Sequence, residues 1–159
     1  MSDLAADIHQ RLLERGETVA TAESLTAGLV GAELTRVAGS SATYRGGVIV
    51  YATELKAQLA GVPGDLLAAR GPVDREVAAA MAVGIRERID ATWGLSLTGV
   101  AGPDPQDGKP VGLVFVGLAV AGRTPAVAEL MLSGDRAAIR TGAVAAALAL
   151  LRDTLAAAE

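Results

Sequence analysis

The chain has 159 residues, the size of one ordinary domain, and 51% of them are hydrophobic, so it can bury a substantial core. Charged residues make up 20% and the mean hydropathy is +0.39, which argues against a disordered chain. It contains no Cys and one His, which excludes disulfides, thiol nucleophiles, zinc fingers and iron–sulfur clusters. The net charge of −4 and the pI near 5.0 argue against a nucleic-acid-binding protein.

No apolar segment reaches the ~18–20 residues that a membrane-spanning helix requires. The first residues lack the basic and then apolar character of a signal peptide. We therefore expect a cytoplasmic protein without membrane partners, with a single domain over residues 1–159. The sequence holds 33 Ala and 19 Gly, which predicts an interior of closely packed helices and strands with small side chains.

Apolar residues at helical spacing predict a helix over residues 3–15, and the rest of the chain alternates between short strands and helices. Strands are predicted at 18–22, 46–51, 93–98, 111–120 and 126–132. Helices are predicted at 25–37, 53–60, from 63 to about 70, at 74–89 and from 136 to the C-terminus. The β-branched run at 46–51 is typical of the centre of a sheet.

The order of these elements predicts an α/β fold of three layers, α/β/α, around a five-stranded mixed sheet. The first three strands are separated by helices and are expected to be parallel, with right-handed crossovers. The fourth strand returns after a loop, so it is antiparallel, and the fifth follows by a hairpin and is parallel again. Open α/β sheets bind ligands at the carboxyl ends of their parallel strands. The unusual polar or glycine-rich segments all fall at that edge: 23–24, 51–56, 98–103, 109–110 and 134–140.

Ser24 lies where the first strand turns towards a helix. It is either an N-capping serine or a nucleophile at a helix N-terminus, where free N–H groups can stabilise an oxyanion. Its flanking residues do not match G-x-S-x-G. The single histidine, His9, lies beside the apolar stripe of the first helix and is interpreted as a surface or edge residue of that helix. A serine nucleophile needs a base, so the base that activates Ser24 is expected to be Lys, Glu or Asp.

Lys56 is one of only two lysines, the other being Lys109. With Thr53 as the expected N-cap, Lys56 falls in a first helical turn, where the helix dipole disfavours a cation and lowers the lysine pKa. A neutral lysine can act as a general base, and a Ser–Lys pair is an alternative to the Ser–His–Asp triad. The other interpretation is a solvated surface lysine. Tyr51 either hydrogen-bonds one of these groups or is a packed aromatic residue.

The segment 98–103 consists of small residues that permit close approach of a ligand to the backbone, or that only form a tight exit from the strand. It matches neither a Walker motif nor G-x-G-x-x-G. Arg136 and Arg140 lie one helical turn apart. Their planar guanidinium groups can clamp a phosphate, or they are ordinary surface arginines.

Five segments, taken together, resemble the C-terminal domain of the CinA (competence/damage-inducible) family, in particular its stand-alone nicotinamide mononucleotide (NMN) amidohydrolases. The resemblance covers nearly the whole chain. It implies a CinA-like fold, hydrolysis of the NMN carboxamide to nicotinic acid mononucleotide and ammonia without a metal or other cofactor, and a homo-oligomer. The resemblance concerns the C-terminal domain, so it does not imply the pyrophosphatase activity that is linked to the family's N-terminal domain. The segments are 22–28, 47–51 with 54 and 56, 98–103, 109–112, and 133–136 with 140.

The resemblance also implies the roles of individual residues. Ser24 is the expected nucleophile, Lys56 the general base and Tyr51 an assisting group. The expected substrate-binding residues are Glu23, Gly47, Thr98, Gly99, Ala101, Gly102, Arg136 and Arg140. The chain departs from the common family pattern beside the base, where Thr53 stands in place of a frequent Asn. The alternative is therefore a non-catalytic nucleotide-binding or regulatory module of the same fold.

Overall fold

The computed structural model describes residues 3–158. Its centre is a five-stranded sheet. The strands lie in the order β2 (Tyr44–Ile49), β1 (Val19–Glu23), β3 (Trp93–Gly99), β4 (Leu113–Val120) and β5 (Ala126–Met131). β1 runs parallel to both β2 and β3, whereas β4 runs antiparallel to both β3 and β5. The predicted mixed topology is confirmed.

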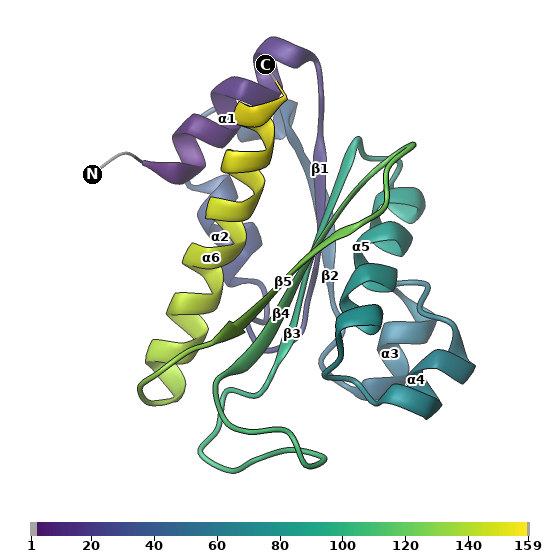
Figure 1. The fold of residues 1–159 in the computed structure, drawn as a ribbon. Helices are drawn as coiled ribbons and strands as arrows, with labels where there is room; N and C mark the ends of the chain where they lie inside the picture. Colours follow the sequence, from purple (N-terminus) through teal and green to yellow (C-terminus); the bar gives the residue numbers. More distant parts are fainter. Residues whose placement is uncertain (1–2, 159) are drawn as a thin grey trace.

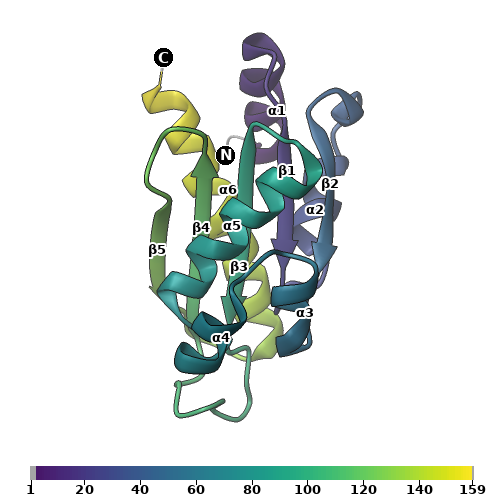
Figure 2. The same ribbon diagram turned by 90° about the vertical axis from the view of Figure 1, so that its right-hand side faces the viewer.

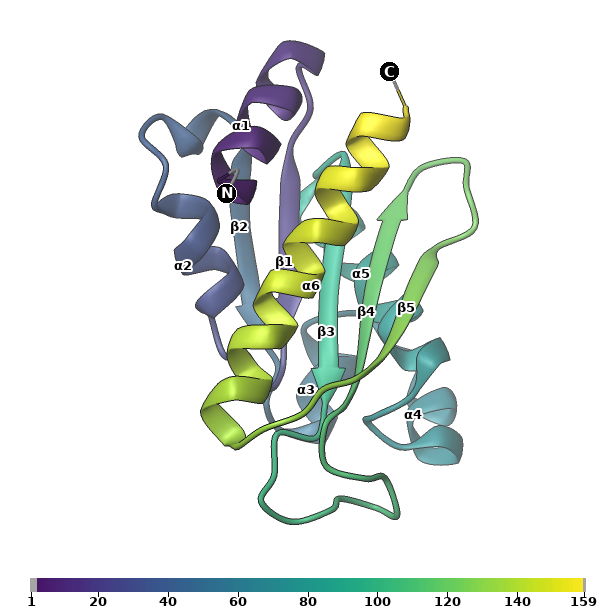
Figure 3. The same ribbon diagram turned by 60° about the vertical axis from the view of Figure 1, so that its left-hand side comes forward.

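Helices cover both faces of this sheet and complete the predicted three layers (Figure 1). One face carries α1 (Leu4–Arg15), α2 (Leu29–Thr35) and α6 (Arg136–Ala157), which stand in front of the strands in Figure 3. The other face carries α3 (Thr53–Gln58), α4 (Gly64–Arg70) and α5 (Arg75–Ile89), which face the viewer in Figure 2. A short 3₁₀ helix, η1 (Ser40–Ala42), precedes β2.

The two helical layers bury separate apolar cores against the sheet. Ile8 and Leu12 of α1 and Leu151 of α6 belong to the larger core. Val77, Met81 and Ile85 belong to the second core, under α5. Each such side chain contributes about 1.5–3 kcal/mol when it is fully buried. The helical stripe that the sequence predicted for residues 74–89 is therefore the buried face of α5.

Small residues allow α5 to lie directly on β3 and β4. A Cβ added to Gly117 would lie 2.5 Å from the carbonyl oxygen of Ala78. The Ser96 hydroxyl donates a hydrogen bond of 2.6 Å to that same carbonyl. The abundance of Ala and Gly thus has a local explanation here, because larger side chains would separate the helix from the sheet.

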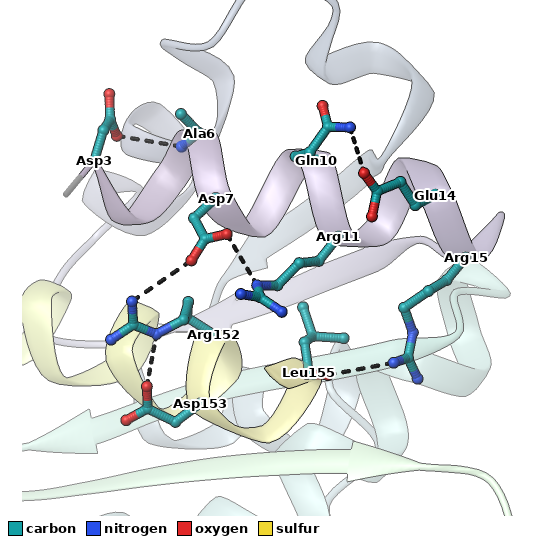
Figure 4. Close-up of polar contacts among 10 residues, drawn as sticks. All are labelled: Asp3, Ala6, Asp7, Gln10, Arg11, Glu14, Arg15, Arg152, Asp153 and Leu155. Carbon is teal, nitrogen blue, oxygen red and sulfur yellow. Dashed lines mark hydrogen bonds and ion pairs between the residues drawn. The ribbon is translucent and has the colours of Figure 1, made fainter. Parts of the chain in front are cut away.

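Polar contacts join the first helix to the last at the surface (Figure 4). Asp7 on α1 accepts a hydrogen bond from Arg11 Nε at 2.9 Å and pairs with Arg152 on α6 at 3.5 Å. Arg15 donates to the carbonyl of Leu155 at 3.3 Å. Partly exposed ion pairs of this kind contribute only about 0–1 kcal/mol each, so the apolar contacts between α1 and α6 supply most of the attachment.

Three local predictions are wrong. The segment at 46–51 was expected at the centre of the sheet, but β2 is an edge strand because β1 lies between β2 and β3. The helix expected at 25–37 begins only at Leu29, since Ala27 and Gly28 have φ of 47° and 99°, in the left-handed region that a right-handed helix excludes. The N-cap of α3 is Ala52 rather than Thr53, without a side-chain cap.

Within residues 3–158, no helix combines the length and the hydropathy needed to cross a membrane.

Candidate active site

Ser24 and Lys56 meet at the carboxyl ends of β1 and β2. Ser24 follows β1, and its N–H donates to the carbonyl of Leu97 on β3 at 3.1 Å. Lys56 extends from α3, and its Nζ lies 3.1 Å from Ser24 Oγ within hydrogen-bond distance. The lysine is 1% exposed and the serine 8%. The fold therefore brings the predicted nucleophile and the predicted base into direct contact in a buried position.

Burial determines the protonation behaviour of this lysine. Loss of hydration disfavours the ammonium form and lowers the pKa of Lys56 from 10.5 to about 8, and the nearby Glu54 carboxylate opposes part of this shift. The sequence predicted a lowered pKa from the helix dipole, whereas the structure assigns the effect to desolvation. A neutral amine has two N–H donors and one lone pair, so it can donate to a carbonyl and still accept the proton of a serine hydroxyl.

The backbone of Val50 connects Lys56 to the strand that precedes Ser24. Lys56 Nζ donates to the Val50 carbonyl at 2.7 Å. The N–H of Val50 donates to the carbonyl of Glu23 at 2.8 Å, and Glu23 directly precedes Ser24 in the chain. Ser24 and Lys56 are thus both fixed relative to the ends of β1 and β2. This arrangement could not be predicted from residue types, because Val50 and Glu23 take part in it only through main-chain atoms.

A cavity of about 310 Å³ opens above the Ser24–Lys56 pair. Its volume is at the lower end of the range of roughly 300–1,000 Å³ that is usual for small-molecule sites. Buried Ser24 and Lys56 contribute to its inner part, and the exposed residues Tyr51 and Arg136 contribute to its outer part. The segments 72–73 and 98–106 supply much of the remaining lining.

Arg136 connects two segments at the mouth of this cavity. Its Nη1 donates to the carbonyl of Gly102 at 2.6 Å, and its Nη2 donates to the hydroxyl of Tyr51 at 3.0 Å. Tyr51 is 60% exposed, and its hydroxyl bonds Arg136 rather than Ser24 or Lys56. The guanidinium group therefore links the start of α6 to the segment after β2 and to the loop after β3.

The glycine-rich loop lines the cavity as predicted, but its small residues pack against protein atoms. A Cβ on Gly99 would lie 2.7 Å from the Leu113 carbonyl oxygen, and one on Gly102 would lie 2.6 Å from Val111 Cγ1. The Thr98 hydroxyl donates to the carbonyl of Pro72 at 2.6 Å. Ala101 lines the cavity and also belongs to the larger core.

Three of the expected substrate-binding residues lie outside the cavity lining. Glu23 and Gly47 line a separate hollow of about 240 Å³ between α2 and β2. Adjacent strand residues point to opposite faces of the sheet, so a position next to the nucleophile does not place a side chain beside the ligand. Arg140, on α6, donates from Nε to the carbonyl of Leu25 at 2.9 Å and so contacts the turn that follows Ser24.

Several lining residues were not singled out from the sequence. Pro72 and Val73 lie between α4 and α5 and line the cavity near the end of β3. No feature of the sequence predicted this position. Asp104 and Gln106 belong to a polar loop whose position depends on the exit from β3. Lys109 is absent from the lining, and its backbone pairs with Gln106. In the part of the chain that the structure describes, no three His, Asp or Glu side chains gather as metal ligands.

Comparison with known proteins identifies the family. The model of the CinA C-terminal domain matches residues 1–155. The chain belongs to this family. It is 52% identical over 145 residues to a CinA-like protein from Frankia casuarinae, covering 91% of this chain and 33% of that protein. It is 49% identical over 153 residues to a CinA-like protein from Anaeromyxobacter sp., covering 94% and 37%. The CinA domain thus spans about a third of the length of these curated relatives.

Solved structures of the CinA superfamily share the whole fold. A CinA superfamily protein from Klebsiella pneumoniae superimposes with a TM-score of 0.92 at 30% identity, covering 98% of this chain and 99% of that chain. The competence damage-inducible protein A from another strain of that species gives a TM-score of 0.93 at 31% identity, covering 97% and 96%. The names of these proteins refer to competence and damage and specify no reaction.

Proposed function

We propose that this CinA domain is an amidohydrolase that converts NMN to nicotinic acid mononucleotide and ammonia. The observation that carries the proposal is the 3.1 Å contact between Ser24 Oγ and Lys56 Nζ inside a cavity, with a lysine whose burial favours the neutral amine. A serine needs an adjacent base to act as a nucleophile, and a desolvated lysine is such a base. The choice of NMN as substrate rests on the resemblance to the amidohydrolases of the family.

The first half of the reaction forms an ester on Ser24. The neutral amine of Lys56 takes the hydroxyl proton of Ser24 while Oγ attacks the carboxamide carbon. The resulting ammonium group donates this proton to the amide nitrogen. The C–N bond then breaks, ammonia leaves, and the nicotinoyl group stays bound to Oγ.

The second half releases the acid and restores both groups. A water molecule attacks the ester carbon and gives a proton to Lys56. The bond between the carbon and Ser24 Oγ breaks, and Lys56 returns the proton to the serine oxygen. Each cycle consumes one amide and one water and yields one carboxylic acid and one ammonia.

Backbone N–H groups beside the nucleophile supply the stabilisation of the oxyanion. The N–H of Ser24 itself donates to Leu97, so it is not free for this purpose. Across residues 3–158, the N–H groups of Leu25 and Ala101 have no protein acceptor, and both residues line the cavity. They are the proposed donors. Removal of one such donor typically lowers the rate by a factor of about 10²–10³.

Arg136 is the proposed ligand of the phosphate. Its guanidinium group is exposed at the mouth of the cavity and already holds two oxygen acceptors, those of Gly102 and Tyr51. Two oxygens of a phosphate group can accept from the two prongs of a guanidinium group, and the phosphate adds charge complementarity. Assembly of the domain as a homo-oligomer, which the family resemblance implies, stays a prediction.

The proposed function is tested by incubating the purified protein with NMN, nicotinamide riboside, nicotinamide and glutamine, with ammonia as the readout. We expect ammonia release from NMN together with formation of nicotinic acid mononucleotide. Binding of NMN in a calorimetric titration, without ammonia release, would instead favour the non-catalytic nucleotide-binding module.

A further inference from the structure

The buried carboxylate of Glu23 has no part in the reaction above, although it adjoins the nucleophile. Glu23 is 2% exposed. Its Oε1 accepts hydrogen bonds from the Thr26 hydroxyl at 2.7 Å and from the Val30 N–H at 2.9 Å. Its Oε2 accepts from the Gly31 N–H at 3.1 Å. Three donors therefore converge on one carboxylate, and all three belong to the segment that follows Ser24.

Glu23 replaces the cap that α2 lacks. The first N–H groups of a helix have no intrahelical acceptor, and a side chain at the N-cap position usually satisfies one of them. The N-cap of α2 is Gly28, which has no side chain to offer. The carboxylate of Glu23 reaches these N–H groups from β1, and its negative charge suits a helix N-terminus.

This contact closes the serine turn, residues 24–28, against the start of α2. Ala27 within the turn has φ of 47°, a left-handed conformation that costs an alanine about 1–2 kcal/mol. Such a conformation persists only where the surroundings hold it. Three hydrogen bonds hold the turn. The Ser24 N–H donates to the Leu97 carbonyl, and the Arg140 guanidinium group donates to the Leu25 carbonyl. The Thr26 hydroxyl donates to the Glu23 carboxylate.

We propose that Glu23 is a positioning residue, which fixes Ser24 Oγ relative to Lys56 Nζ by holding the serine turn to α2, and which does not touch the substrate. The proposal rests on the proposed role of Ser24 as the nucleophile. A misplacement of reacting groups by about 1 Å can lower a rate by about 10²-fold. Loss of the carboxylate is therefore expected to change the reactivity of the serine and to leave substrate binding largely intact.

Two pairs of variants separate this role from simple stabilisation. Glu23→Gln keeps the shape of the side chain but removes its charge and places an NH₂ group against at least one of the three donors. Thr26→Val removes the hydroxyl that bonds Glu23 and keeps the shape, whereas Thr26→Ser keeps the hydroxyl. Asp3→Ala is the control, because Asp3 caps another helix, α1, by accepting from the Ala6 N–H at 3.2 Å. Asp3 also pairs with Arg36 at the C-cap of α2 at 2.7 Å, so this variant shows the effect of losing a cap and an exposed ion pair away from the serine.

The readout is the second-order rate at which a fluorophosphonate probe labels Ser24, located by peptide mass spectrometry, together with kcat, KM for NMN and Tm. We expect Glu23→Gln to lower both the labelling rate and kcat by about tenfold or more, with KM within about twofold of the wild type. Thr26→Val should show a smaller loss of the same kind, and Thr26→Ser should restore it. Asp3→Ala should lower Tm only.

Wild-type labelling rates in both Glu23→Gln and Thr26→Val would overturn the proposal and make Glu23 a structural cap. If Glu23→Gln does not fold, the two Thr26 variants decide. The probe reports on Ser24 without NMN, so the two proposals fail separately. A wild-type protein that is labelled rapidly but releases no ammonia from NMN would refute the proposed function, while slower labelling of the variants would still support the role of Glu23.

Discussion

Replacement of Lys56 by methionine tests whether the pKa of this lysine is lowered in the folded protein. The pKa of Lys56 is about 8 in the folded protein, against 10.5 for an ordinary lysine. A shift of this size corresponds to about 3 kcal/mol between the two protonation states. The methionine side chain has a similar length and no titratable group, so it removes this contribution without opening a large cavity.

The sign of the effect follows from which state holds the proton. Below about pH 8 the folded and unfolded states both carry the ammonium form, so stability does not depend on pH through this group. Between about pH 8 and pH 10.5 the folded state is neutral while the unfolded state stays protonated, so the wild type gains stability as the pH rises. Between about pH 7 and pH 10 the gain amounts to about 2.5 kcal/mol.

Urea unfolding followed by the fluorescence of Trp93, the single tryptophan, measures this gain. The free energy of unfolding of the wild type minus that of Lys56→Met should grow by about 2–2.5 kcal/mol between about pH 7 and pH 10. The difference cancels groups that titrate in both proteins. A constant offset is also expected, because the Val50 carbonyl loses its donor. An equal difference at both pH values would show that the pKa of Lys56 is not lowered in the folded protein.

Three further predictions concern activity and packing. First, kcat/KM for NMN should rise about tenfold per pH unit up to about pH 8 and then level off, since only neutral Lys56 acts as a base; a flat profile between about pH 6 and pH 8 would contradict this. Second, Arg136→Lys loses the planar fork that holds Gly102 and Tyr51, so steady-state assays should show KM raised about tenfold with a smaller change in kcat; an unchanged KM would exclude Arg136 from substrate binding. Third, Gly99→Ala places a Cβ 2.7 Å from the Leu113 carbonyl oxygen, so urea unfolding should show a loss of about 1–3 kcal/mol; wild-type stability would show that β4 can move aside.

The location of the site could be predicted from the sequence because it depends on topology. Once the first three strands are parallel, the residues after each of them must lie at one edge of the sheet. This places Ser24, Lys56 and the loop at 98–103 together without knowledge of any side chain. With a single His, the base is expected to be Lys, Glu or Asp, and the chain holds only two lysines, Lys56 and Lys109.

The finer arrangement could not be predicted because it depends on local backbone geometry. The positive φ of Ala27 and Gly28 delays α2, so Ser24 lies in a turn rather than at the helix N-terminus. Glu23 accepts hydrogen bonds from the first N–H groups of α2 and lies outside the cavity lining. The low pKa of Lys56 was expected, but its cause, burial among neighbouring segments, becomes visible only in three dimensions.

The most direct test of the account compares ammonia release from NMN by the wild type and by Ser24→Ala, with circular dichroism to confirm that both are folded. Ser24 is 8% exposed and its hydroxyl bonds Lys56, and the alanine variant keeps Cβ while it removes only Oγ. We predict that the wild type releases ammonia and forms nicotinic acid mononucleotide, and that folded Ser24→Ala releases none. Ammonia release by Ser24→Ala at the wild-type rate would contradict the mechanism.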